Sequence, residues 1–232
     1  MDYTSTDTSR RLTTPASTSQ RSTDEARARA LLQGAFAQQY TFPRRFSGFR
    51  ADIVVQNNDR KCSGKIIAHA SHNIDVLLDD ADMQRLVRRE IQSFLLWHQY
   101  LPVNQRIGPY PLVLDNTPHP LGVCITLHGE RLETHYRVQN DSITERYRGT
   151  APESTTTQIL DHHQVPDGRL LPRYSITFFC KQGSGRLVQS EARIDEHIDI
   201  QGVWLPTLRQ VSIVASGTMT AYSIRLNCHW LM

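Results

Sequence analysis

The sequence has little of what defines several large classes of protein. It holds 4 cysteines, and no two of them form the C-x-x-C pair of a zinc knuckle or a redox motif. It lacks a run of about 20 apolar residues, which a membrane helix requires, and its first residues lack the apolar core of a secretory signal. We therefore expect the cysteines to be small buried side chains, and the protein to be cytoplasmic without a transmembrane segment.

An excess of charge of one sign is also missing. The chain has 26 basic and 23 acidic residues, for a net charge of +3. A protein that binds nucleic acid usually gathers its positive charge on one face or tail, so no nucleic-acid partner is expected. The chain contains no G-x-S-x-G elbow, glycine-rich phosphate loop or H-E-x-x-H motif. No cofactor is expected, and enzyme classes that short motifs define are not indicated.

The first 23 residues differ in composition from the rest. Serine and threonine dominate them, with scattered charges and almost no large apolar residue, so they cannot repay the entropy of becoming ordered. We predict a disordered tail over residues 1–23 and a single domain over residues 24–232. Ser22 and Glu25 form a capping-box pattern at the start of a helix that is predicted to run to the Phe42-Pro43 break.

Alternating residues then predict a hairpin over residues 49–68, and apolar residues at three- and four-residue steps predict a second helix over residues 80–100. Beyond a proline-rich connection, the chain alternates as strands separated by turns. Seven or more consecutive strands without intervening helices favour an antiparallel meander. The predicted fold is mainly β (α+β): a strongly curved antiparallel sheet or open β-barrel with the N-terminal helix and the second helix packed on or in it.

One predicted strand carries a row of candidate catalytic groups. Glu191, Asp195 and His197 alternate on one face with Arg193, which places an acid, a fixed cation and a general base together. The opposite face of that strand is apolar, so the polar row is read first as a solvated face and second as the lining of a barrel lumen. Histidines at positions 69, 72, 162 and 163 diverge on strands, and no metal site is expected.

Aromatic residues supply the material for a core or for an apolar pocket. Such a pocket could hold a lipid, a pigment or an isoprenoid. The candidate ligand-binding residues are Phe36, Phe94, Trp97, Phe178, Trp204 and Trp230.

Three short segments resemble a known family. Phe46 to Ile53 after a helix, Asp167-Gly168-Arg169 before Leu171-Pro172, and Gly202 to Pro206 near the end look like the family of domain of unknown function 3386, known mainly from cyanobacteria and other bacteria. The family carries no catalytic residues to transfer. The layout is also similar to that of bacterial lipoprotein carriers, which implies an open barrel with a hydrophobic cavity.

Two functions remain open from the sequence. The first is a non-enzymatic binding or accessory protein that holds a hydrophobic small molecule or assists a protein partner, alone or as a homo-oligomer. The second is a small β-barrel enzyme, a cyclase or isomerase, in which Glu191, Asp195 or His197 moves protons beside an apolar substrate.

Overall fold

A computed structural model describes residues 18–129 and 133–232. Within them, twelve strands form one antiparallel sheet that does not close into a barrel, in the order β3-β2-β1-β12-β11-β10-β9-β8-β7-β6-β5-β4. The strands are β1 (Gly48–Asn57), β2 (Arg60–His69), β3 (Ile74–Leu77), β4 (Leu112–Asp115), β5 (Val123–His128), β6 (Glu133–Gln139), β7 (Ser142–Thr150), β8 (Glu153–Gln164), β9 (Leu170–Lys181), β10 (Leu187–Ile200), β11 (Val203–Ala215) and β12 (Thr218–Leu231). The predicted fold class is confirmed.

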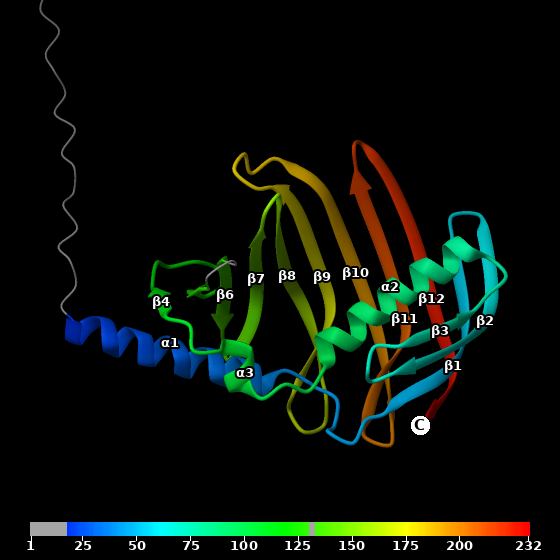
Figure 1. Ribbon diagram of the computed structural model, residues 1–232, viewed down its shortest axis with the longest axis horizontal. Coiled ribbons are helices and arrows are strands. Elements are labelled where there is room, and N and C mark those ends of the chain that lie inside the picture. The colour runs from blue at the N-terminus through cyan, green and yellow to red at the C-terminus, as the bar shows by residue number, and fades with distance from the viewer. Residues whose placement is uncertain (1–17, 130–132) are drawn as a thin grey trace, which may run out of the picture.

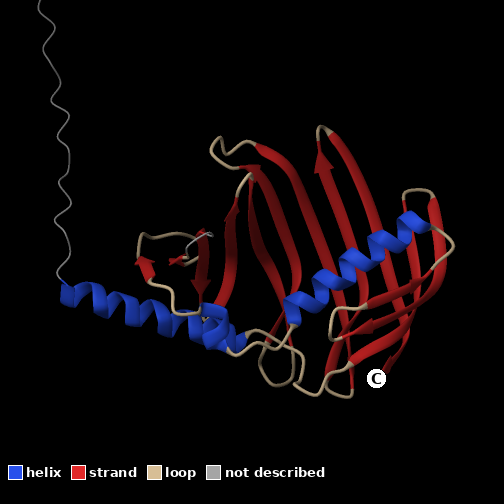
Figure 2. Ribbon diagram, viewed as in Figure 1, coloured by secondary structure: helices blue, strands red, loops and turns tan. Residues whose placement is uncertain are grey.

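Short turns connect the strands from β6 to β12, and the last strand, β12, pairs with β1. The sheet is strongly curved, and helix α2 runs obliquely across its concave face (Figures 1 and 2). The β10–β11 turn consists of Gln201 and Gly202, with φ of 54° and 82°. Glycine adopts this left-handed conformation without steric cost, which explains the turn predicted there.

Helix α1 (Thr18–Gln38) packs against one end of the sheet. Its buried face consists of Ala28, Leu32, Ala35 and Phe36, and the ring of Phe36 meets Tyr136 edge to face at 5.4 Å. The helix begins before the predicted capping box, so residues 18–23 of the expected tail are helical. Residues 1–17 of that tail lie outside the described residues.

Helix α2 (Ala81–His98), predicted over residues 80–100, covers the other end of the sheet. The side chain of Asp80 caps it, because Oδ1 accepts hydrogen bonds from the amides of Asp82 and Met83 at 2.9 and 3.1 Å. Its buried positions follow helical spacing. Five of them, Met83, Val87, Ile91, Phe94 and Leu95, join a hydrophobic core with β1, β2, β3, β11 and β12, and the other two, Glu90 and His98, are buried polar residues.

The proline-rich connection contains two short elements that the sequence did not separate, helix α3 (Val103–Ile107) and strand β4. Ile107 is fully buried in the α1 core. None of the helices in the described residues is long and apolar enough to cross a membrane. The expectation that the cysteines are buried is wrong. Cys62, Cys124 and Cys180 are half-buried and Cys228 is exposed.

In strand β10 the polar face is covered and the apolar face is partly exposed, which is the reverse of the first expectation. Its apolar residues Ile194 and Ile198 are 40% and 42% exposed on the outer face of the sheet. The polar row faces inward toward α2, and only 7% of the surface of Asp195 is exposed to solvent. The reading of this row as a solvated face is therefore wrong: the row faces the concave side of the sheet, and this sheet does not close around a barrel lumen.

The last strand changes face near its end. Tyr222, Ile224 and Leu226 are buried as the alternation predicts. Cys228 then adopts a left-handed φ of 50°, next to an irregularity in the pairing with β1. This bulge turns Trp230 to the outside, where it is 59% exposed, so the predicted apolar face of this strand ends at Leu226.

Candidate functional site

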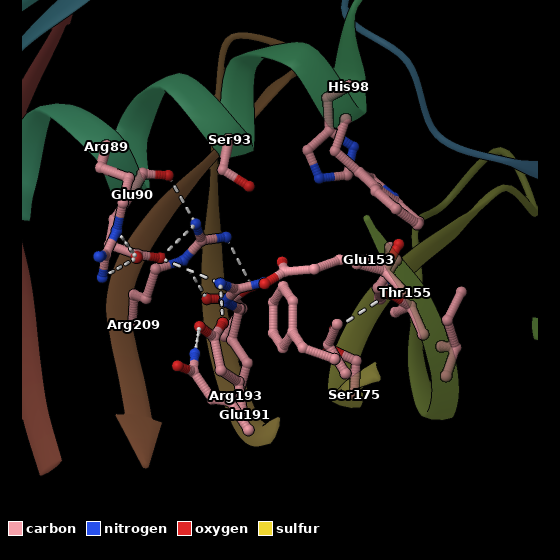
Figure 3. A pocket seen from close by; sticks show the side chains of 18 of the residues that line it. Arg89, Glu90, Ser93, His98, Glu153, Thr155, Ser175, Glu191, Arg193 and Arg209 are labelled. Carbon is pink, nitrogen blue, oxygen red and sulfur yellow. Dashed lines mark hydrogen bonds and ion pairs between the residues drawn. The ribbon is translucent and has the colours of Figure 1, made fainter. Parts of the chain in front are cut away.

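The two helix-packed cores leave the middle of the concave face uncovered. The α1 core lies over β4–β7, and the α2 core lies over β1–β3, β11 and β12. Between them, the inner faces of β8, β9 and β10 line a cleft of about 540 Å³ beside α2, which we call the α2 cleft. Figure 3 shows helix side chains above this space and strand side chains below and beside it. A cavity of this volume suits a small organic ligand.

One end of the cleft is a buried network of charges. Arg209 is 4% exposed and donates to both oxygens of Asp195, from Nε at 2.7 Å and from Nη2 at 2.8 Å. Its remaining nitrogen donates to the backbone oxygen of Glu90 at 2.7 Å. Strand β11 thereby holds strand β10 and helix α2 together through one side chain (Figure 3).

Glu90 is the second carboxylate of this network and is 2% exposed. It accepts hydrogen bonds from the hydroxyl of Tyr222 at 2.8 Å and from Arg193 at 3.2 Å. Burial alone would raise the pKa of Glu90, but Arg209, Arg193 and the Tyr222 hydroxyl outweigh it and hold the pKa below its ordinary value. Glu90 is therefore a carboxylate at neutral pH.

The network is balanced in charge. Glu191 accepts a hydrogen bond from Gln189 at 2.7 Å and lies 3.5 Å from Arg193. Three arginines and three carboxylates contribute, namely Arg89, Arg193, Arg209, Glu90, Glu191 and Asp195. Paired charges of this kind can be buried, and they fix α2 on the sheet at this end of the cleft.

Two histidines lie beside the ring of Phe94. The rings of His98 and His197 lie 4.7 and 6.0 Å from that ring. Burial lowers the pKa of His98 to about 3 and that of His197 to about 4, so both are neutral at pH 7. His98 contacts the backbone oxygen of Tyr40 at 3.3 Å, whereas Nε2 of His197 has no hydrogen-bond partner among the described residues.

The other end of the cleft is largely apolar, and hydroxyl groups and Glu153 complete its lining. Trp97 lies on α2 above it, while Ile159 and Phe179 project from β8 and β9. The hydroxyls of Thr157 and Thr177 bond each other at 3.0 Å, so their polarity is largely satisfied. Ser175 and Thr155 complete this wall (Figure 3). The cleft thus joins an apolar compartment to a charged one.

Two of the three predicted catalytic residues line the α2 cleft and the third does not. Glu191 and Asp195 line the cleft, but His197 is not among its lining residues. Both oxygens of Asp195 accept hydrogen bonds from Arg209. Within the described chain, no group of three or more His, Cys, Asp or Glu side chains is placed to hold a metal ion.

Among the predicted ligand-binding aromatics, Trp97 lies in the cleft wall. Phe94 is 1% exposed in the α2 core and Phe36 is in the α1 core, where it also borders a second cleft. Trp204 is half-buried against the α2 core, with its ring 4.7 Å from that of His163. Trp230 is exposed on the outer face.

Phe178 does not line the α2 cleft, but the next residue, Phe179, does. Side chains alternate along β9, and Phe179 is the residue that lines the cleft. Sequence reasoning also missed the hydroxyl wall, although Thr155, Thr157, Ser175 and Thr177 share the same period-two spacing. Of the predicted ligand-binding residues, Trp97 lines the α2 cleft. The other five, Phe36, Phe94, Phe178, Trp204 and Trp230, are not among its lining residues.

The fold and cleft define a class: a curved open sheet with a helix across its concave face and an internal amphipathic cleft. Residues 23–229 match the family described as protein of unknown function (DUF3386), and the chain belongs to that family, as its sequence predicted. Among curated proteins, no match was found.

Two solved structures are similar to this chain, each at 7% identity and over 90% of this chain and 93% of the other. One is described as an outer membrane lipoprotein-sorting protein domain from Vibrio parahaemolyticus, with a TM-score of 0.38. The other is a DUF1329 family protein from Desulfovibrio piger, with a TM-score of 0.27.

Proposed function

We propose that this protein is a non-enzymatic binding or accessory protein that holds an amphipathic small molecule in the α2 cleft. The observation that carries the proposal is the division of the cleft into two parts. Trp97, Ile159 and Phe179 offer an apolar surface, and the Arg209–Asp195 network closes the other end. Apolar pockets with a few placed polar groups are the usual form of small-molecule sites.

The polar network supports binding better than proton transfer. Asp195 already has both oxygens engaged by Arg209, and His197 does not line the cleft. Glu191 is the remaining predicted acid with access to the space. The cyclase or isomerase alternative, like the cytoplasmic location, stays a prediction. Turnover of a bound molecule that Glu191→Gln abolishes would support the enzymatic alternative.

Native mass spectrometry tests the proposal directly. The protein is purified from its natural host and from a heterologous host, and whatever co-purifies is extracted into organic solvent and identified. We expect an apolar or amphipathic molecule from the natural host in stoichiometric amount. Protein that is empty from both hosts, and that takes up no amphiphile offered to it, would contradict the proposal and favour an accessory role toward a protein partner.

A further inference from the structure

A second cleft adjoins the first on the far side of Trp97. Its volume is about 620 Å³, and it lies between the end of α1, helices α2 and α3, and strands β6 and β7. We call it the arginine cleft. Its lining includes Arg89, Arg106, Arg146 and Arg148, and no aspartate or glutamate.

Most of these arginines lack a counter-charge. Arg89 pairs with Glu90 at 3.1 Å. Among the described residues, no carboxylate forms a salt bridge with Arg106, Arg146 or Arg148. Glu145, the acidic neighbour on β7, faces away from this cleft and pairs with Arg137. The cleft therefore holds positive charge that the protein itself does not neutralise.

Aromatic rings hold two of the guanidinium groups. Arg146 lies 5.5 Å from the ring centre of Trp97, and Arg106 lies 5.2 Å from that of Phe36. Arg106 also donates to the side chain of Gln39 at 2.8 Å. Cation–π contacts of this kind orient a guanidinium group without neutralising it. Both groups are thus preorganised and still able to pair with an anion.

Unused hydrogen-bond donors lie at the same place. Nε of Arg146 and Nε1 of Trp97 are both buried, and neither has a hydrogen-bond partner in the described part of the chain. A buried donor without an acceptor costs free energy that an incoming acceptor would recover. Burial lowers the pKa of Arg146, partly opposed by Tyr136, and the nearby charges of Arg148 and Arg106 lower it further.

The two clefts share one wall. Arg89, Ser93 and Trp97 line both, so a single molecule passing Trp97 contacts the apolar compartment and the arginines. We propose that the arginine cleft binds the anionic head group, a carboxylate or a phosphate, of the amphipathic molecule whose apolar chain occupies the α2 cleft. This inference rests on the proposed function and specifies the charge of its ligand.

Three probes of equal chain length separate the two proposals: myristyl alcohol, myristate and myristyl phosphate, each titrated into delipidated full-length protein by calorimetry. A hydrogen bond to a charged group is stronger than one between neutral groups. We therefore expect at least one anion to bind the wild type about tenfold or more tightly than the alcohol. The stronger of the two anions identifies the head group as carboxylate or phosphate.

Arg146→Gln should remove most of that tenfold preference and leave the binding of the alcohol unchanged. Arg148→Gln, at an exposed position of the same cleft, should reduce the preference too, and it serves if Arg146→Gln does not fold. Arg225→Gln, at an exposed position on β12, is the matched control and should change nothing.

Each outcome has a distinct meaning. Equal binding of alcohol and anions to the wild type would overturn this inference and leave the proposed function standing. A preference for anions that remains in both arginine variants would also overturn it, because residues outside the arginine cleft would then bind the anionic head group. Failure of all three probes to bind would contradict the proposed function, and this inference with it.

Discussion

Arg209 and Asp195 lie directly opposite each other on neighbouring strands, and the guanidinium group of one donates to both carboxylate oxygens of the other. The pair is almost fully buried beneath α2. Arg209 also donates to the backbone of Glu90 on the helix, so this single pair connects the sheet to the helix that forms the roof of the α2 cleft.

Breaking this pair should be costly. Removing one partner of a buried ion pair leaves the other charge without compensation, which typically costs about 3–5 kcal/mol. We expect Arg209→Gln to lower the free energy of unfolding by that amount in urea denaturation. Arg173→Gln is the matched control, because Arg173 pairs with Asp161 at 3.6 Å on the surface, where a pair contributes about 0–1 kcal/mol. Equal losses in the two variants would refute the assignment.

Stability should fall in mild acid because of the buried histidines. Burial lowers the pKa of His197 from 6.5 to about 4, although Asp195 opposes the shift. The unfolded chain therefore binds the proton more readily, and stability is lost as the pH falls from 6.5 through about 4. His197→Leu should reduce the slope of stability against pH by up to about 1.4 kcal/mol per pH unit.

Urea denaturation at a series of pH values measures that slope. His128→Leu, at an exposed position on β5, is the control and should keep the wild-type slope. The account of His197 fails if its removal leaves the slope between those pH values unchanged.

The N-terminal cap of α2, the helix that covers the cleft, should contribute to the stability of the protein. Asp80 accepts two backbone hydrogen bonds at the start of the helix, and loss of such a cap costs about 0.5–2 kcal/mol. Asp80→Ala should destabilise the protein by that amount, whereas Asp79→Ala, at the exposed neighbouring position, should not. Chemical denaturation of both variants makes the comparison, and similar midpoints would argue against the cap.

Much of the fold could be predicted because local patterns determine it. The spacing from Met83 to Leu95 and the acidic residues before it defined α2, and the turn at Asn57 to Asp59 defined the β1–β2 hairpin. Pro172 and Pro206 lie inside β9 and β11, next to irregular pairings, where a missing amide is tolerated.

The site was harder to predict, because alternation distinguishes two faces of a strand without telling which one is covered. On β10, the polar face is covered, since α2 brings its own Glu90 to complement Arg193 and Arg209. That complement comes from a helix about a hundred positions away. The positions of Arg146 and Arg148, two apart on one strand, are a signal in the sequence for a row of positive charge on one face of that strand.

The most direct test of the central claim is the calorimetric titration of myristyl alcohol into two variants that differ by one position. Ser175 lines the α2 cleft, and Ile176, the next residue on β9, points to the opposite face. A bulky ring in the cleft should exclude the ligand, so Ser175→Phe should weaken binding by about tenfold or more, while Ile176→Phe should bind like the wild type. Equal affinity of the two variants would show that the α2 cleft is not the binding site.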